Sequence, residues 1–71
     1  MENNELLLSL LIYDRQSIKA AIKAYQALAK ISVAETSDTA MLHFDNCRYD
    51  PTITKHEFTN YLINLENTKI N

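Results

Sequence analysis

A chain of 71 residues, 46% of them hydrophobic, has room for a single domain over 1–71, and a domain of this size buries only about 60% of the surface that its unfolded form exposes. Seven lysines and arginines against nine aspartates and glutamates give a formal net charge of −2 without a basic cluster, which argues against nucleic acid as a ligand. Glycine is absent, and this argues against phosphate-binding loops, which need the close backbone approach that glycine allows.

The single cysteine, Cys47, cannot form a disulfide within this chain and fits a reducing compartment. The residues before the first apolar run are acidic or amide-bearing, whereas a secretory signal peptide begins with positive charge. The run itself is too short to cross a bilayer. We therefore expect a cytoplasmic protein without a membrane interaction, with disordered ends at about 1–4 and 67–71.

The first expected element is a strand over 6–13, with the sequence LLLSLLIY. Alternation makes both of its faces apolar, which is typical of a strand that is covered on both sides. A chain this small covers only one face well, so we expect the other face to contact a partner. One face would carry Leu6, Leu8, Leu10 and Ile12, and the other would carry Leu7, Ser9, Leu11 and Tyr13.

A helix is expected next, because Asp14 can cap its N-terminus and apolar residues then recur at helical spacing. The polar residues at 19, 23 and 26 fall on the opposite side, which indicates a solvated face. The apolar stripe consists of Ile18, Ala21, Ile22, Tyr25 and either Leu28 or Ala29, and the solvated face of Lys19, Lys23 and Gln26.

A hairpin follows, in which 30–36 and 40–45 alternate around a turn at Ser37 and Asp38. Ile31 and Val33 face one way on its first strand. On its second strand Ala40, Leu42 and Phe44 share one face, and Met41, His43 and Asp45 share the other.

The last element is expected to be a helix that begins at Thr54. Thr54 and Glu57 match a capping box, and Ile53 and Phe58 occupy the two positions of a hydrophobic staple. Asn67 is a candidate stop. The expected buried stripe is Phe58, Tyr61, Leu62 and Leu65.

These elements predict an α+β fold, a small two-layer sandwich with a three-stranded mixed sheet and both helices on one face. The first two strands, joined through a helix, should run parallel by a right-handed crossover, with the third antiparallel. The uncovered sheet face would then be an interface. The candidate partner-binding residues are Leu7, Leu11, Tyr13, Met41, His43 and Tyr49.

Residues that could carry chemistry are few. His43, Asp45 and Cys47 alternate along a strand end, but three potential ligands at this spacing do not make a zinc motif, and a half-polar strand is the better interpretation. His56 and Glu57 begin a metalloprotease-like helix pattern that lacks the second histidine, since residue 60 is asparagine. We therefore expect no metal site and no cofactor.

A nucleophile interpretation would pair Cys47 with His43 or His56, but no third group or oxyanion hole can be named. Tyr25 and Tyr61 belong to the expected core stripes, and no basic residues interleave with the other tyrosines as base stacking requires. A catalytic role for Cys47 therefore ranks below the two non-catalytic hypotheses that follow, an accessory subunit and a self-associating module.

Three stretches together resemble a known family: YDRQSIK with alanine two residues later at 13–21, ISV at 31–33, and EF-x-NYL at 57–62. Over roughly 8–66 the chain resembles the HxsD-like family of small proteins, which are encoded beside radical SAM enzymes that modify ribosomally made peptides. The small partner of cyanobacterial peptide spliceases is the variant it looks most similar to. The resemblance implies an accessory subunit that binds the maturase, the leader of the precursor peptide, or both.

The cysteine count agrees with that role, since a radical SAM catalyst needs three cysteines for its iron–sulfur cluster and this chain has one. The leading hypothesis is a non-catalytic subunit that presents precursor peptide, with a sheet edge as one means of binding an extended leader. The alternative is a self-associating module, a homodimer that packs two open sheet faces together and binds no peptide.

Overall fold

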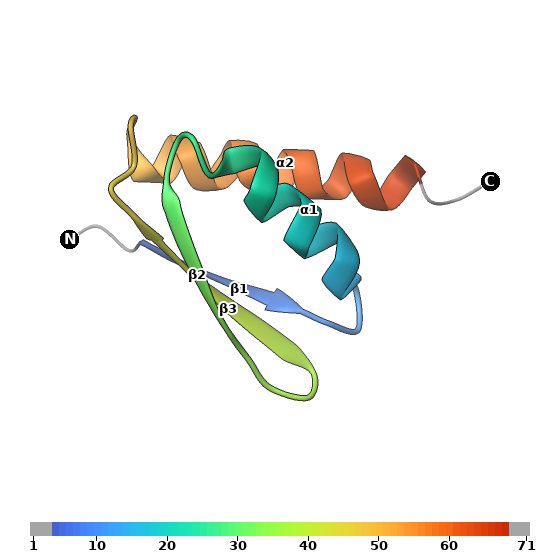
Figure 1. Ribbon diagram of the computed structural model, residues 1–71. Helices are drawn as coiled ribbons and strands as arrows, with labels where there is room; N and C mark the ends of the chain where they lie inside the picture. Colours follow the sequence, from blue (N-terminus) through green and yellow to red (C-terminus); the bar gives the residue numbers. More distant parts are fainter. Residues whose placement is uncertain (1–3, 69–71) are drawn as a thin grey trace.

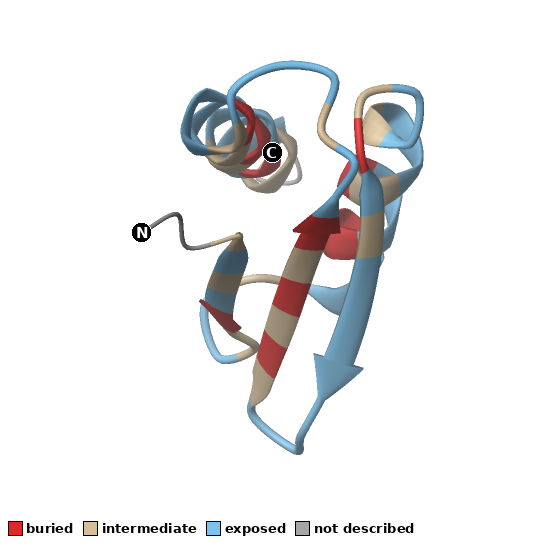
Figure 2. Cartoon of the chain, turned by 90° about the vertical axis from the view of Figure 1, so that its left-hand side faces the viewer, coloured by how far each residue is buried: buried red, intermediate tan, exposed pale blue. Residues whose placement is uncertain are grey.

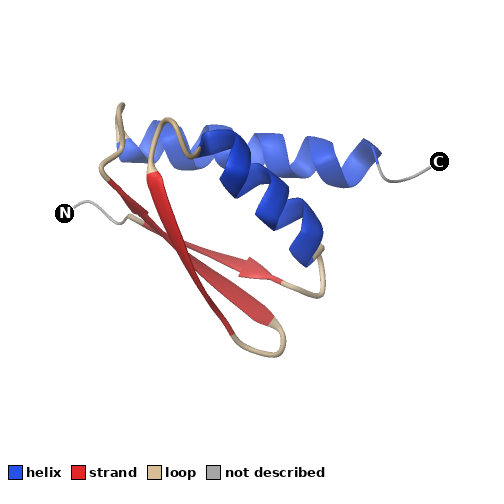
Figure 3. Ribbon diagram, in the orientation of Figure 1, coloured by secondary structure: helices blue, strands red, loops and turns tan. Residues whose placement is uncertain are grey.

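The computed structural model describes residues 4–68, which fold as one sheet with two helices on the same face (Figures 1 and 3). This confirms the expected α+β class and the order strand, helix, strand, strand, helix. The elements are β1 (Glu5–Ser9), α1 (Arg15–Tyr25), β2 (Lys30–Glu35), β3 (Thr39–Asp45) and α2 (Pro51–Thr68).

The strand order in the sheet is β1-β3-β2, and both neighbouring pairs are antiparallel. β1 and β2 run in the same direction, as the crossover through α1 predicts. The expected mixed sheet is nevertheless corrected to an antiparallel one, because β3 turns back from β2 and pairs with both strands. The central position buries the helix-facing side of β3, which carries Ala40, Leu42 and Phe44.

The core lies between the sheet and the helices. β3 alternates between buried and half-buried residues, as Figure 2 shows along its length. The Phe58 ring of α2 packs edge-on against Phe44 of β3 and Tyr25 of α1, with centroids 5.4 and 5.5 Å away. The buried apolar residues are Leu8, Ile18, Ala21, Ala29, Ala40, Leu42, Phe44, Phe58 and Leu62.

β1 is shorter than expected, ending at Ser9 rather than at residue 13. The last backbone contact along its β3 side joins the Leu10 N–H to the Asp38 carbonyl, 2.8 Å away, and β3 itself begins at Thr39. The chain then turns, and the N–H groups of residues 12 and 13 both donate to the Ser9 carbonyl. The interpretation of 6–13 as one strand was therefore wrong, because the partner strand has no residues left to pair with it.

α1 begins where the sequence indicates. The Asp14 carboxylate accepts a hydrogen bond from the Gln16 N–H at 2.9 Å, which confirms Asp14 as the N-cap. The expected solvated face is exposed, and Ile18 and Ala21 are buried.

α2 begins at Pro51, three residues before the expected start. The Asp50 carboxylate accepts from the Thr52 N–H at 2.9 Å, and the Asp50 carbonyl accepts from the Thr54 N–H, as in an N-cap. Proline is favoured at the first helical position, where its missing N–H costs nothing. Thr54 is buried inside the helix, where its hydroxyl donates to the Asp50 carbonyl at 3.0 Å. The prediction that Thr54 and Glu57 form a capping box at the start of this helix was therefore wrong.

The other end of α2 continues through the expected stop at Asn67 and reaches Thr68. Phe58 and Leu62 of the expected stripe are buried, whereas Tyr61 is exposed. At the opposite end of the chain, the Asn4 carbonyl accepts from the Phe44 N–H at 2.8 Å. Of the ends expected to be disordered, 1–3 and 69–71 lie outside the described residues.

Candidate docking surfaces

The six predicted partner-binding residues lie in three separate places, although all of them except Tyr49 were expected on the open face of the sheet. Three lie on the open face of the sheet, two in the connection from β1 to α1, and one in the connection from β3 to α2. The single interface expected from a long, two-sided first strand is therefore wrong in its geometry. In the order of those places, the residues are Leu7, Met41 and His43, then Leu11 and Tyr13, then Tyr49.

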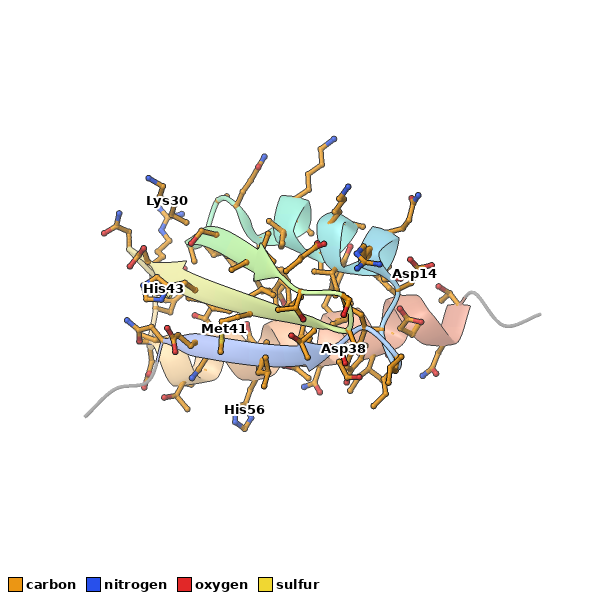
Figure 4. The ribbon with its side chains drawn as sticks, turned by 90° about the horizontal axis from the view of Figure 1, so that it is seen from below. Asp14, Lys30, Asp38, Met41, His43 and His56 are labelled. Carbon is orange, nitrogen blue, oxygen red and sulfur yellow. The ribbon has the colours of Figure 1, made fainter. Side chains whose placement is uncertain are left out.

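The open face carries one narrow apolar row. Leu7 pairs with Met41, and Met41 pairs with Ala34 across the second ladder. Figure 4 looks onto this face, where no described helix covers Met41 or His43. The next row on one side joins Glu5, His43 and Ser32 and is polar, so the apolar row does not widen into a large patch.

His43 has carboxylates near both ring nitrogens. Its Nε2 lies 3.1 Å from Asp45 Oδ1, and its Nδ1 lies 3.7 Å from Glu5 Oε2. Both carboxylates are about half exposed. The cluster lies on the solvent side of the sheet and spans β1 and β3.

The connection from β1 to α1 exposes two large apolar side chains. Leu11 is 85% exposed and Ile12 is 70% exposed, because both lie in the turn and not on a strand face. Tyr13 differs from the expectation, since it packs against the core. Ile12 was assigned to the covered face, and the early end of the strand explains why that assignment failed.

The connection from β3 to α2 forms a hollow with the first turns of α2. Tyr49 and Ile53, 62% and 54% exposed, line it together with Leu28, Thr54 and Glu57. Ile53 lies within α2 rather than before it, so it does not form the expected staple.

Glu57 also acts on a nearby phenol. Burial, the negative charge of Glu57 and the neighbouring Tyr61 together raise the pKa of Tyr25 above its ordinary value. The Tyr25 and Tyr61 rings pack edge-on with centroids 5.7 Å apart, which joins α1 to α2 at this end.

The residues considered for chemistry do not converge. Cys47 is half-buried against the core, and Figure 4 places His43 on the open face and His56 on α2, pointing away from the sheet. Over residues 4–68, no group of three histidine, cysteine, aspartate or glutamate side chains is arranged to hold a metal ion.

Both outer strands present unpaired backbone groups at the sheet edges. The Phe44 N–H bonds to the Asn4 carbonyl, so in β1 the even-numbered residues face β3 and Leu7 points its N–H and C=O outward. The Thr36 N–H bonds to the Thr39 carbonyl, so in β2 the odd-numbered residues point outward in the same way. Sequence alternation identifies side-chain faces and cannot identify these edges.

Taken together, the fold and surfaces define a small α+β domain with one covered sheet face, one open face and two outer strands with outward-pointing backbone groups. No family model, curated protein or solved structure matches the chain. None of the helices in residues 4–68 combines the length and apolarity needed to cross a bilayer.

Proposed function

We propose that this protein is a non-catalytic accessory subunit that binds a radical SAM maturase, the leader of a ribosomally made precursor peptide, or both, and so supports modification of the peptide. The resemblance to the HxsD-like family over roughly 8–66 is the reason for proposing a radical SAM maturase and its precursor peptide as partners. In this proposal the protein acts in the cytoplasm, and the maturase supplies the catalytic iron–sulfur cluster.

The observation that carries the proposal is the apolar surface left uncovered by the opening segment. Leu7 is 61% exposed, and Leu11 and Ile12 are still more exposed. All three lie within residues 6–12, the same segment that contributes Leu8 to the core. Large apolar side chains grouped along a short exposed segment are typical of interaction sites. Burying these side chains against a partner would contribute a favourable free energy of about 25 cal/mol for each Å² of apolar surface removed from water.

The sheet supports a specific way of binding a leader. An extended peptide can add to an exposed edge through main-chain hydrogen bonds, with alternate side chains providing specificity. Both edges of this sheet have outward backbone groups, and neither requires the fold to open first.

Co-purification with the maturase and fluorescence-anisotropy titration with the leader test the proposal. Ile12→Asp should weaken binding at least tenfold while the fold is retained, because the side chain lies in an exposed turn. Ile63→Asp is the matched control, since it changes a partly exposed isoleucine on α2 in the same way. Failure of the unaltered protein to bind either partner at tens of micromolar would end the proposal.

Self-association is the second candidate, and the row of Leu7, Met41 and Ala34 on the open face favours it. Two copies could pack these rows together. Light scattering distinguishes the candidates: a dimer that Leu7→Asp converts to a monomer, with no affinity for maturase or leader, would establish the second one.

A further inference from the structure

β2 has the longer free edge of the sheet. Its odd-numbered residues Ile31, Val33 and Glu35 direct their N–H and C=O groups away from β3. Within residues 4–68 these groups take part in no hydrogen bond. Figure 2 shows β2 as a largely exposed strand beside the half-buried β3.

This edge lacks the usual protection against an added strand. Edge strands are normally shielded by proline, a bulge, an inward-pointing charge or a covering element. The interior of β2 reads Ile-Ser-Val-Ala over 31–34 and has no proline, bulge or charge, so the charged residues of this strand are confined to its ends, Lys30 and the Arg15-paired Glu35. Val33 pairs with the buried Leu42 and so faces the helices, yet it is 43% exposed because nothing lies beyond it at the edge.

α1 runs beside the same edge. The Arg15 Nε lies 3.0 Å from Glu35 Oε1, and a second guanidinium nitrogen donates to the Thr36 carbonyl. Helical spacing places Lys19 and Gln26 on the same side of α1 as Arg15. In Figure 4 α1 lies along the β2 side of the sheet, and α2 lies along the β1 side. A strand added to β2 would therefore pass beside this side of α1.

The charge beside this edge is positive, in contrast to the chain as a whole. α1 contains Arg15, Lys19 and Lys23 and no acidic residue, and β2 begins with Lys30. These are four of the seven basic residues in a chain of net charge −2. Among residues 4–68, only Arg15 of the four has an ion pair. The edge is thus complementary to an acidic segment.

The β1 edge offers less. The Glu5 carbonyl already accepts from the Lys55 ammonium at 3.4 Å, and the Ser9 carbonyl accepts from the turn that follows it. Only Leu7 keeps both of its outward backbone groups for a partner strand.

We infer that an extended, acidic peptide segment docks on the edge of β2 as a fourth strand. Apolar side chains at alternate positions of the segment cover Ile31 and Val33 on the helix side of the sheet, and the carboxylates between them point to the open face, on which Lys30 lies. The lysines of α1 add long-range attraction. The inference rests on the proposed function in one respect, since it takes the partner to be a polypeptide, and it adds the place and the chemistry of binding.

The test uses two-dimensional amide NMR of the full chain with two synthetic probes, a short peptide of alternating aspartate and valine and its lysine–valine counterpart. The acidic probe should shift the amides of Ile31, Val33 and Glu35 and slow their hydrogen exchange at least tenfold, because the added strand accepts these hydrogen bonds. The Leu7 amide should not change. The lysine–valine probe should bind more weakly at low salt.

Two matched pairs of variants locate the site. Val33→Pro removes an outward N–H from β2, and Leu7→Pro does the same on β1, where an edge strand tolerates proline. Val33→Pro should abolish binding, and Leu7→Pro should leave it unchanged. Lys30→Glu, a surface change that does not depend on proline being accommodated, should weaken binding at least threefold, whereas Lys55→Glu beside β1 should not.

Several results would overturn the inference: no binding of the acidic probe, tighter binding of the basic one, or protection at Leu7 in place of Val33. Concentration-dependent protection of Ile31 and Val33 without any peptide would also overturn it, since a second copy would then occupy the edge. Binding of maturase and leader with unchanged β2 amides would refute this inference and leave the proposed function standing. Loss of both partners, with the acidic probe still bound at β2, would refute only the function.

Discussion

β1 and β2 flank the same central strand, yet different forces hold them. β1 is five residues long, inserts Leu8 into the core and has Lys55 of α2 bonded to its edge. β2 is six residues long, has no fully buried residue and is tied at its end by the Arg15–Glu35 ion pair. Both strands are paired with β3, but β1 adds a fully buried side chain, whereas β2 adds the half-buried Ile31 and a surface contact.

This difference separates stability from binding. Replacing the one deeply buried side chain of β1 should cost stability, whereas β2 has no such side chain and should tolerate substitutions at lower cost. β2 therefore has more positions at which side chains can vary without loss of stability, whereas in β1 Leu8 is constrained by the core.

The largest expected effect comes from truncating the two edges in parallel. Leu8→Ala should lower the free energy of unfolding by about 2–4 kcal/mol, because it leaves a cavity beside β3. Val33→Ala should cost less than about 1 kcal/mol, since the side chain is nearly half exposed. Urea unfolding measures both. Equal losses would show that β2 is held by packing after all.

The helix caps come next. Asp14→Ala and Asp50→Ala should each cost about 1 kcal/mol, because each carboxylate accepts a hydrogen bond from an N–H in the first turn of its helix. Glu57→Gln should cost almost nothing, since Glu57 is not a capping residue in the structure. Thermal unfolding compares the three variants, and a loss at Glu57 equal to that at Asp50 would restore the capping box. Similar losses of stability in Asp14→Ala and Asp50→Ala would show that the two helices are equally stabilised by their caps. The difference between β1 and β2 would then not come from the caps.

A smaller effect is expected at the ion pair beside β2. Arg15→Gln and Glu35→Gln should each cost about 0.2–1 kcal/mol, because both side chains are partly exposed. A double-mutant cycle should give a coupling that fades as salt is added. Amide exchange at the end of β2 should become faster in either variant and stay unchanged in β1. Equal acceleration in both strands would mean that the pair stabilises the whole sheet.

The smallest effect concerns Tyr25 of α1, whose ring packs against Phe58 and Tyr61 of α2. Its raised pKa means that the folded chain holds the phenolic proton more tightly than the unfolded chain does. This contribution to stability is intact below pH 10, the ordinary tyrosine value, and is lost as the pH rises through the folded pKa. Tyrosinate absorbance should show one late-ionising tyrosine, which Tyr25→Phe removes and Glu57→Gln shifts downward. A titration unaffected by Tyr25→Phe would contradict the assignment.

Much of the fold could be predicted because its signals are local. Asp14 caps α1 through a residue two positions away, and the alternation of Ala40, Leu42 and Phe44 fixes which side of β3 is buried. Neither depends on where the rest of the chain lies. The start of α2 was local as well, but two signals competed, and the proline at the first helical position with its aspartate cap prevailed over the capping box.

The candidate surfaces could be predicted only in part. Leu7, Leu11 and Tyr49 are exposed as the pattern suggested, but Tyr13 packs against the core and Ile12 replaces it in the exposed turn. The pattern of a strand says which residues alternate and not how long its partner is. The free edge of β2 gave no signal at all in the sequence, because backbone groups are the same in every residue.

By itself the sequence determined the types and order of the elements, the side of β3 that is buried and the first helix cap, since these follow from hydrogen bonds and periodicities within a few residues. Only the tertiary structure decided that β3 lies between β1 and β2, where the first strand ends and which backbone groups remain unpaired. These features depend on contacts between segments that are distant in the chain. The same local patterns are compatible with more than one arrangement of those segments.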